Sequence, residues 1–394
     1  MPNPPRHSAA TTCHICGHLD VEPLEQKGKP FRLVSSDVQP VTGTAEFSIC
    51  PRCLTVQKTI TPTWQAMADR IYASYDINHQ SQGAEPTIFD SAKGSGPRSL
   101  ILLRNFLDMV DLAGEGRLLD FGCSNGNLLK SFHGLRPDWK LSGAELFDQW
   151  KDTVLALPGV EAFYSGANAA YAEKFDVISL SHVLEHIPDP ISFLKEISGH
   201  LTPRGRILLA MPNLRQNPSD LIIADHCSHF DENSLSYVTH AAGLHTELFS
   251  TEMLPKELVA VLSVGGPSAG PPLAAGDGGK ASRERCLFYF KLLDEVREAA
   301  KSYREEGRPL GIMGSSIAAC WTMMELDGKV DFFVDEDRNR VGHQLLDLPI
   351  IDPSRVPEGA LVFIPMSVAV AERIIQRWKG HAIDFRYVPT NRPG

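Results

Sequence analysis

The sequence predicts an α/β protein with two Rossmann-like sheets and a small N-terminal domain built around cysteines. Three features support this fold class. A buried strand, a glycine turn and the start of a helix follow one another in residues 118–129, and the same order recurs in residues 309–319. Two C-x-x-C pairs precede both units. The apolar runs before each turn are typical of parallel strands covered on both faces.

The first glycine turn, Gly122 to Gly126, has the chemistry of a ligand-binding loop. Glycine allows the backbone to approach a ligand at a distance that a Cβ atom would forbid. The helix that follows offers N–H groups without partners inside the helix. Many α/β proteins contain such a turn, so the downstream segments decide which ligand it binds.

Three further segments follow in order. The run Lys140–Glu145 predicts a second strand that ends in an acid, 25 residues after Asp120. An acid in this place can accept ribose hydroxyls, and a solvated carboxylate at a strand end is the plain alternative. Residues 175–190 predict a buried strand, a histidine-bearing loop and a helix that starts at a proline. Residues 201–210 predict another apolar strand.

In this order the segments resemble the class I S-adenosylmethionine (SAM)-dependent methyltransferases. A nicotinamide-binding Rossmann domain is the alternative, but its G-x-G-x-x-G motif needs a glycine where this chain has Ser124. The resemblance implies that SAM is the cofactor. It also implies the residues that bind SAM: Asp120, Gly122, Cys123, Gly126, Glu145, Leu146, Ser181 and His182.

Composition limits the partners of the chain. With 394 residues, of which 43% are hydrophobic, it should form two or three domains. A formal net charge of −10 argues against general binding to nucleic acid or anionic membrane. No apolar run has the length of a membrane span, and residues 1–12 lack the apolar core of a signal peptide. We therefore expect a cytoplasmic protein without disulfides.

Four of the eight cysteines form the two early pairs, Cys13 with Cys16 and Cys50 with Cys53. Each C-x-x-C places two thiolates on one tight turn, and two such turns complete a tetrahedral zinc site. A site with four thiolates has no open position, so this zinc should be structural. His14 and His18 are alternative ligands, and a redox role for either pair is disfavoured because no βαβ pattern surrounds them.

Composition shifts divide the chain, with a Gly/Pro/Ala-rich stretch at residues 265–279 as the clearest break. The second turn, Gly311–Ser316, and an acid at the end of a later strand, Asp335, are compatible with a nucleotide site. The same turn is equally compatible with simple packing of a strand on a helix. The predicted domains are 1–60 (zinc-binding), 61–96 (connector), 97–255 (methyltransferase), 256–282 (linker) and 283–394 (Rossmann-like).

Candidate bases stand in two loops, residues 181–186 and 225–230. Histidine suits proton transfer because its pKa of about 6.5 lies near neutrality. Asp225 can stabilise charge on the adjacent His226, although neighbouring side chains often point apart. A metal site with Cys227 and His229 is possible, but we expect Cys227 to be buried and His229 to lie near the surface.

The order of domains resembles the NDP-sugar C-methyltransferases that act on 4-keto-6-deoxyhexoses. The motifs that carry this resemblance are C-x-x-C-G at Cys13–Gly17, C-x-x-C-x-x-V-Q at Cys50–Gln57, and H-x-P at His186–Pro188. A further motif is an acid–His pair, Asp225-His226, with an aromatic and an acid downstream. The resemblance covers nearly the whole chain and implies a nucleotide-sugar substrate; it leaves the oligomeric state open.

By this match His226 removes the sugar C3 proton beside Asp225, and His186 lies in the sugar pocket. Tyr75 matches a tyrosine near the family's active site. The chain departs from the family in having Asp225 for a glutamate and Ile223 for a tyrosine. Two alternatives therefore stay open. One is an O-methyltransferase acting on a glycan or other small molecule, and the other is a non-catalytic module that binds a nucleotide and zinc.

Overall fold

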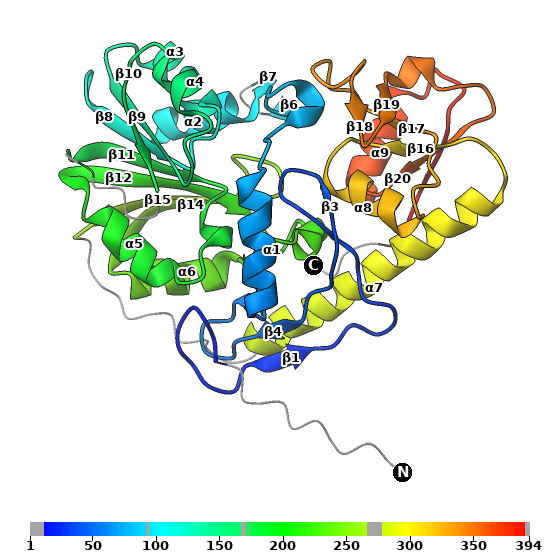
Figure 1. The fold of residues 1–394 in the computed structure, drawn as a ribbon, viewed down its shortest axis with the longest axis horizontal. Coiled ribbons are helices and arrows are strands. Elements are labelled where there is room, and N and C mark those ends of the chain that lie inside the picture. Colours follow the sequence, from blue (N-terminus) through cyan, green and yellow to red (C-terminus); the bar gives the residue numbers. More distant parts are fainter. Residues whose placement is uncertain (1–11, 92–93, 167–170, 172, 266–277, 391–394) are drawn as a thin grey trace.

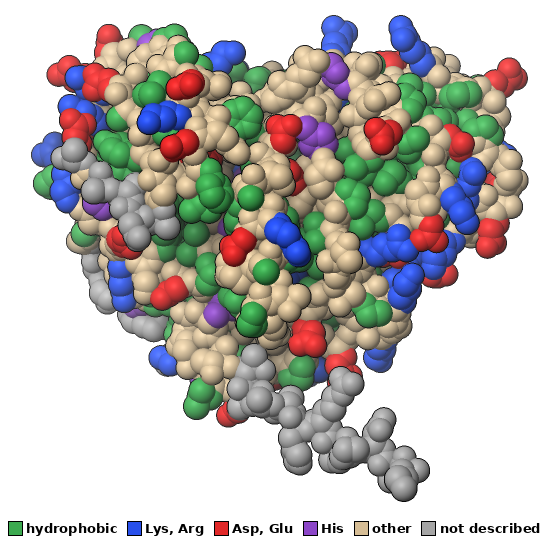
Figure 2. All heavy atoms as spheres, in the orientation of Figure 1, with side chains coloured by type: hydrophobic (Ala, Val, Ile, Leu, Met, Phe, Trp, Pro, Cys, Tyr) green, Lys and Arg blue, Asp and Glu red, His purple; other side chains and the backbone are tan. Residues whose placement is uncertain are grey.

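A computed structural model describes residues 12–91, 94–166, 171, 173–265 and 278–390 (Figure 1). Its architecture is the predicted one: an N-terminal cysteine cluster, a central Rossmann-like sheet and a C-terminal parallel sheet. None of the helices in these ranges is long and apolar enough to cross a membrane. The face drawn in Figure 2 carries basic and acidic side chains intermingled.

The N-terminal part consists of short strands: β1 (Glu22–Leu24), β2 (Leu33–Val34), β3 (Pro40–Val41), β4 (Phe47–Ile49) and β5 (Val56–Lys58). Strands β2 and β3 form a hairpin, and β1, β4 and β5 form an antiparallel sheet. The fourth strand of that sheet, β13 (Ser228–His229), comes from the middle of the chain. The loop that carries the candidate base His226 is therefore held against the cysteine domain by the pairing of β13 with β5.

Helix α1 (Pro62–Ala73) connects the cysteine domain to the central sheet. Thr61 starts it by accepting a hydrogen bond from the N–H of Trp64, and Pro62 occupies the first turn, where no N–H is needed. The indole of Trp64 donates to the carbonyl of Ala224 at 3.0 Å. A short helical turn η1 (His79–Ser81) and the hairpin β6 (Thr87–Ser91) and β7 (Gly94–Pro97) follow.

The central sheet has the order β10-β9-β8-β11-β12-β15-β14. Strand β15 pairs antiparallel with both β12 and β14, and the other pairs of neighbouring strands are parallel. Helices lie on both of its faces, α2 to α4 on one and α5 and α6 on the other (Figure 1). Its strands are β8 (Arg117–Phe121), β9 (Lys140–Glu145), β10 (Val160–Ser165), β11 (Phe175–Ser181), β12 (Leu201–Pro212), β14 (Leu244–Ser250) and β15 (Glu257–Val264). Its helices are α2 (Arg98–Met109), α3 (Asn127–Leu135), α4 (Lys151–Leu155), α5 (Pro190–Ser198) and α6 (Glu232–Ala241).

The central sheet extends past residue 255, where we placed the start of a linker. Strand β15 pairs with β12 along its whole length, because its apolar run from Leu258 to Leu262 is buried between two strands. The predicted linker thus begins after Val264 rather than at 256. Most of the rest of it lies outside the described residues, and helix α7 (Gly278–Glu305) follows.

The C-terminal sheet has the order β18-β19-β17-β16-β20-β21 and is parallel except at β18. Aromatic contacts join it to the N-terminal part: the ring of Phe31 lies 5.9 Å from Phe290 on α7 and 6.1 Å from Trp321. Its elements are β16 (Leu310–Met313), α8 (Ile317–Glu325), β17 (Phe332–Val334), β18 (Gln344–Leu345), β19 (Leu348–Ile351), β20 (Leu361–Ile364), α9 (Val368–Arg377) and β21 (Asp384–Tyr387).

Candidate active site

A cavity of about 310 Å³ opens at the carboxyl ends of β8, β9 and β11. The strand order reverses here, since β9 lies on one side of β8 and β11 on the other. Such a switch point is where open α/β sheets bind their ligands. The cavity is lined both by the glycine turn, through Gly122, and by the loop after β11, through His182 and His186.

The glycine turn takes the shape that ligand approach requires. Gly122 has φ +75°, and a Cβ atom there would lie 2.7 Å from Val183. The N–H groups of Gly122 and Cys123 both donate to the carbonyl of Ala144, at 2.8 and 3.2 Å. These bonds fix the turn against the end of β9.

Glu145 ends β9 and lines the cavity, as do Gly122 and Leu146. Its two carboxylate oxygens accept hydrogen bonds from the N–H of Ser124 at 2.6 Å and from its neighbour Leu146 at 3.1 Å. Burial raises the pKa of Glu145, and these bonds oppose that rise. Each oxygen keeps a second lone pair, so the carboxylate can accept further bonds from a ligand.

Four of the predicted cofactor residues do not line the cavity. Asp120 is buried, and Ser179 Oγ donates to it at 2.7 Å. Burial raises the pKa of Asp120 to about 7. Cys123 is buried in the core, Gly126 precedes the first residue of α3, and Ser181 accepts a hydrogen bond from Arg98. Asp120 lies in β8 and Ser181 ends β11, so these two residues flank the turn without lining the cavity.

His182, also predicted to bind the cofactor, lines the cavity. Its ring lies between two carboxylates, with Nδ1 3.3 Å from Glu185 and Nε2 3.4 Å from Glu257. Burial and Arg98 would lower its pKa, but Glu257 and Glu185 outweigh them and raise it to about 9. Arg98 in turn donates to Glu257, with Nε 2.7 Å from Oε1.

His186 and Tyr75 line the same cavity, together with Tyr72 and Ser36. Nδ1 of His186 lies 3.0 Å from the Tyr72 hydroxyl and 3.3 Å from Asp225 Oδ2. Burial opposes protonation of His186, but the hydrogen bond that its ring donates to Asp225 outweighs burial and raises the pKa. His186 and Asp225 therefore form a dyad.

The carboxylate that orients His226 is Asp220, which the sequence did not suggest. His226 Nδ1 donates to Asp220 Oδ1 at 2.6 Å, whereas Asp225 accepts from the backbone and hydroxyl of Ser36. The hydrogen-bond partner of His226 is thus Asp220. Asp225 still interacts electrostatically with His226, so its support of a charge on His226 stays a prediction. The ring of His226 lies 4.5 Å from that of His186 and is buried behind it.

His229 was expected near the surface and is buried, with Nδ1 2.7 Å from Asp220 Oδ2. Burial lowers its pKa to about 4. Burial alone would raise the pKa of Asp220, but His229 and His226 hold it well below its usual range. Cys227 is buried, as expected. Ligand atoms of Glu185, His186 and His226 lie within 4.8 Å of one another, close enough for a metal ion.

The loop that carries Asp225 and His226 is held by the cysteine domain. Strand β5 pairs with β13, and the N–H of Lys58 donates to the carbonyl of Cys227 at 2.9 Å. The buried ammonium of Lys58 donates to the carbonyls of Ile223 and His226. Burial lowers the pKa of Lys58 to about 8.

The four predicted cysteines come together as one cluster. Their sulfur atoms lie within 4.8 Å of one another, with Cys13 3.7 Å from Cys53 and Cys16 3.5 Å from Cys50. Tetrahedral zinc with Zn–S bonds of about 2.3 Å needs sulfur separations near 3.8 Å, so the cluster can hold this metal. His14 is engaged with Ser228 instead, and all eight cysteines are free.

The second glycine turn packs closely against the neighbouring strand β17. A Cβ atom on Gly311 would lie 2.2 Å from the ring of Phe332. Asp335 accepts from Ser315 Oγ at 2.6 Å and from the N–H of Asp337 at 3.0 Å. These two bonds hold Asp335 against its own turn, and each of its oxygens keeps a second lone pair.

Comparison with known proteins supports the assignment of the central sheet. Residues 96–247 match a family model described as a methyltransferase domain. A ubiquinone biosynthesis O-methyltransferase of Histophilus somni is 43% identical over 54 residues, which cover 14% of this chain and 23% of the relative. A protein of the same name from Marinobacter nauticus is 28% identical over 151 residues, covering 34% of this chain and 60% of the relative.

A trans-aconitate 2-methyltransferase of Azoarcus sp. is 27% identical over 124 residues, covering 31% of this chain and 49% of the relative. The chain thus spans less than two thirds of the length of these curated relatives. Among solved structures, a SAM-dependent methyltransferase from Clostridium acetobutylicum has a TM-score of 0.35 and 12% identity, covering 52% of this chain and 98% of the other. The chain contains a class I SAM-dependent methyltransferase domain.

Proposed function

We propose that the chain is a SAM-dependent methyltransferase that C-methylates an NDP-4-keto-deoxysugar through an enolate. One observation carries the proposal. A single cavity has Gly122 and Glu145 at its cofactor end and His186 and Tyr75 among the other residues of its wall. A methyl donor can therefore lie in the same space as His186, against whose ring His226 packs at 4.5 Å.

We assign SAM binding to four residues that line the cavity, Gly122, Glu145, Leu146 and His182. We assign a supporting role to the other four predicted cofactor residues, Asp120, Cys123, Gly126 and Ser181. SAM supplies a methyl group that its sulfonium already activates. The chain contributes orientation: Glu145 accepts from the ribose, and the bare Gly122 permits close approach.

We assign the base to His226. Its Nδ1–H donates to Asp220, so the neutral ring carries its lone pair on Nε2, the form that can accept a proton. The carboxylate of Asp220 then stabilises the imidazolium that forms. Asp220 is a positioning residue in this scheme.

We assign to His186 the role of stabilising charge on the ketone oxygen as the α-proton leaves. Asp225 raises its pKa and so favours the charged ring, which can donate to an oxyanion. Tyr75 and Tyr72 lie on the same wall. Burial raises the pKa of both phenols, so they remain hydrogen-bond donors.

We also propose that the four cysteines bind a structural zinc. We further propose that a zinc-binding domain, a connector, the methyltransferase domain and a linker precede the C-terminal domain, and that the methyltransferase domain includes β15. The pairing of β5 with β13 supports a further consequence. Loss of the metal should loosen the loop of His226 and leave the cofactor end intact.

O-methylation of another small molecule is the second candidate, because curated relatives of the domain are named as O-methyltransferases. A base near the methyl donor can remove a proton from a hydroxyl as well as from carbon. A non-catalytic binding module is disfavoured by the buried, oriented histidines.

The test is incubation of the purified chain with SAM and a panel of NDP-4-keto sugars, followed by mass spectrometry. We expect one sugar to gain one CH₂. S-adenosylhomocysteine (SAH) binding by calorimetry runs beside it. A chain that binds neither SAH nor SAM is not a methyltransferase, and one that binds SAH but methylates no keto sugar belongs to the second candidate.

A further inference from the structure

Three side chains with metal-ligating atoms meet where the short helix η2 (Leu184–His186) packs against the loop before β13. Glu185 and His186 belong to η2, and the loop is held to it by a hydrogen bond from the N–H of Cys227 to the carbonyl of Glu185, at 2.9 Å. A carboxylate oxygen of Glu185 and a ring nitrogen each of His186 and His226 lie within 4.8 Å of one another. Nitrogen and oxygen ligands at about 2.1 Å from one ion are roughly 3–4 Å apart. Small shifts would therefore bring all three side chains onto a single ion.

Glu185 is the member of this cluster that the proposed reaction does not use. Its side chain is 1% exposed, and neither of its carboxylate oxygens has a hydrogen-bond partner among the described residues. Nδ1 of His182 lies 3.3 Å from one of these oxygens, as an ion pair. Buried polar groups are normally hydrogen-bonded, and a buried carboxylate that lacks such bonds is costly. A metal cation would use the lone pairs that this carboxylate leaves free.

The two histidines are oriented as metal ligands usually are. Nδ1 of His226 donates to Asp220 at 2.6 Å. Nδ1 of His186 lies 3.3 Å from Asp225 and 3.0 Å from the hydroxyl of Tyr72. A carboxylate on one ring nitrogen is the usual partner of a histidine that binds a metal through the other, because it fixes the ring and makes the ligand more basic. Each histidine thus has its outer carboxylate and keeps Nε2 for an ion.

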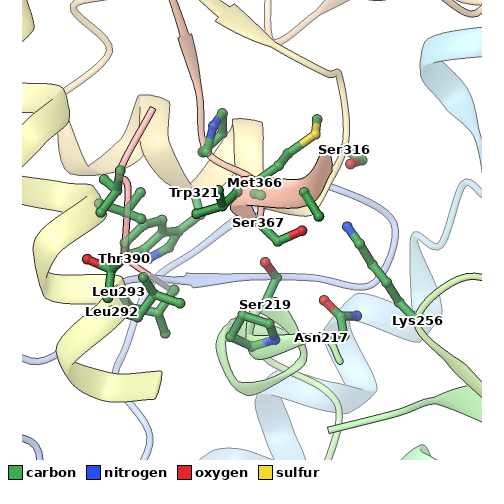
Figure 3. Close-up of a pocket in the computed structure, with 17 residues that line it drawn as sticks. Asn217, Ser219, Lys256, Leu292, Leu293, Ser316, Trp321, Met366, Ser367 and Thr390 are labelled. Carbon is green, nitrogen blue, oxygen red and sulfur yellow. The ribbon is translucent and has the colours of Figure 1, made fainter. Parts of the chain in front are cut away.

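The cluster can be reached from the cavity of the candidate active site. His186 lines this cavity, and Glu185 and His226 are buried next to His186. Figure 3 shows Asn217 and Ser219 on the wall of a separate cavity of about 300 Å³ between the methyltransferase and C-terminal domains. The next residue, Asp220, does not line that cavity and bonds to His226 instead. An ion can therefore enter through the space that the substrate also uses.

The ligand set indicates which kind of ion fits. Imidazole suits zinc, copper, iron and nickel, whereas Mg²⁺ and Ca²⁺ take oxygen ligands. Two histidines and one carboxylate therefore favour a divalent transition-metal ion and leave coordination positions open. The cysteine cluster differs in this respect, since four thiolates close the coordination sphere of zinc.

We propose that Glu185, His186 and His226 bind a divalent transition-metal ion, and that this ion switches the enzyme off. The binding does not depend on the proposed function. The inhibition rests on it, because the ion occupies the lone pair with which His226 accepts the α-proton and the ring position with which His186 donates to the ketone oxygen. Metal and turnover therefore exclude each other.

The probe for binding is Co²⁺ alone, added by equilibrium dialysis to the whole zinc-loaded chain, with both metals counted by elemental analysis. We expect close to one cobalt per chain and an unchanged zinc content, which shows that cobalt has not entered the cysteine cluster. Loss of an outer-shell partner alone costs about 10–100-fold in metal affinity, so Glu185→Gln should weaken cobalt binding at least tenfold. Glu115→Gln is the matched control, because it removes the same charge from an exposed position of the same domain.

A second variant, His186→Gln, removes a different ligand and should weaken cobalt binding as much. Melting temperatures and zinc contents near those of the wild type show that both variants are folded, and one folded variant is enough for the test. Absence of cobalt from the wild type, or wild-type cobalt affinity in the folded variants, would overturn the inference and leave the proposed function standing.

The inhibition is tested by turnover of the NDP-4-keto sugar before cobalt loading, after it, and after dialysis against metal-free buffer. We expect turnover to fall at least tenfold with cobalt bound, to recover on dialysis, and to be unaffected by Mg²⁺. Full turnover with cobalt bound would refute the inhibition. If no keto sugar is methylated, the proposed function fails, and the cobalt count in the wild type and the variants still decides whether the metal site exists.

Discussion

Replacing Asp220 with Asn is the most informative single change at the reaction site. The carboxylate accepts from His226 at 2.6 Å and from His229 at 2.7 Å, and all three side chains are buried. An amide of the same shape has one accepting atom and one donating atom. It can therefore accept from one histidine only, and the other must present its Nδ1 lone pair to the amide NH₂ group.

The size of the effect follows from these two arrangements. If the amide donates to His226, the ring proton moves to Nε2, and the loss approaches that of a general base, roughly 10²–10⁴-fold. If the amide accepts from His226, the tautomer survives but the negative charge is gone. Charged hydrogen bonds contribute about 1.5–3 kcal/mol and neutral ones about 0.5–1.5 kcal/mol, so turnover still falls about tenfold.

The assay measures kcat and the exchange of the substrate's α-proton with deuterated solvent. We expect Asp220→Asn to lower both at least tenfold, with SAH affinity unchanged. Asp138→Asn, at an exposed position of the same domain, is the control and should match the wild type. Turnover of Asp220→Asn within about threefold of wild type would refute the assignment of His226 as the base.

Three further predictions follow. Cys50→Ser should lose the zinc, measured by elemental analysis, and lower kcat through the loosened His226 loop while SAH affinity stays the same; an unchanged zinc content would contradict it. Arg98 and His182 outweigh burial and lower the pKa of Glu257 from 4.5 to about 2. The ionised Glu257 therefore stabilises the folded chain by at most about 3 kcal/mol. This contribution is present above pH 4.5 and is lost as the pH falls toward 2. Denaturant unfolding at pH 7 and pH 3 should show this loss in the wild type and a smaller one in Glu257→Gln. Since Asp225 raises the pKa of His186, activity that needs the charged ring declines above that pKa, and Asp225→Asn should move the basic limb of the kcat/KM profile to lower pH; an unmoved limb would exclude His186 as the charged group.

The fold was predictable because its signals are local. Apolar runs followed by glycine turns locate strands such as Arg117–Phe121 and Leu310–Met313 without knowledge of their neighbours. The cysteine cluster was predictable because each C-x-x-C pair is a local turn and four thiolates on two such turns are typical of a single metal site. The end of the central sheet was missed, since the apolar run of β15 stands next to the Gly/Pro-rich stretch that suggested a linker.

The candidate site was predictable only in part, because hydrogen-bond partners are set by tertiary packing. Nothing in the run Pro218–Ile222 distinguishes Asp220 from an exposed acid, yet it is buried between two histidines. Asp225 was predicted from its place beside His226, and its hydrogen-bond partners, Ser36 and His186, could not be read from the sequence. The hydrogen bonds that Asp335 accepts from its own turn could not be read from the sequence either.

The central claim is that the methyl group goes to a carbon next to a ketone, with His226 removing the proton. The most direct measurement uses SAM with a ¹³C-labelled methyl group and the NDP-4-keto sugar found in the panel, and locates the label in the product by proton–carbon NMR correlation. The account predicts a methyl bound to the carbon next to the ketone, with no product from His226→Ala. A methyl bound to oxygen, or normal product from His226→Ala, would contradict it.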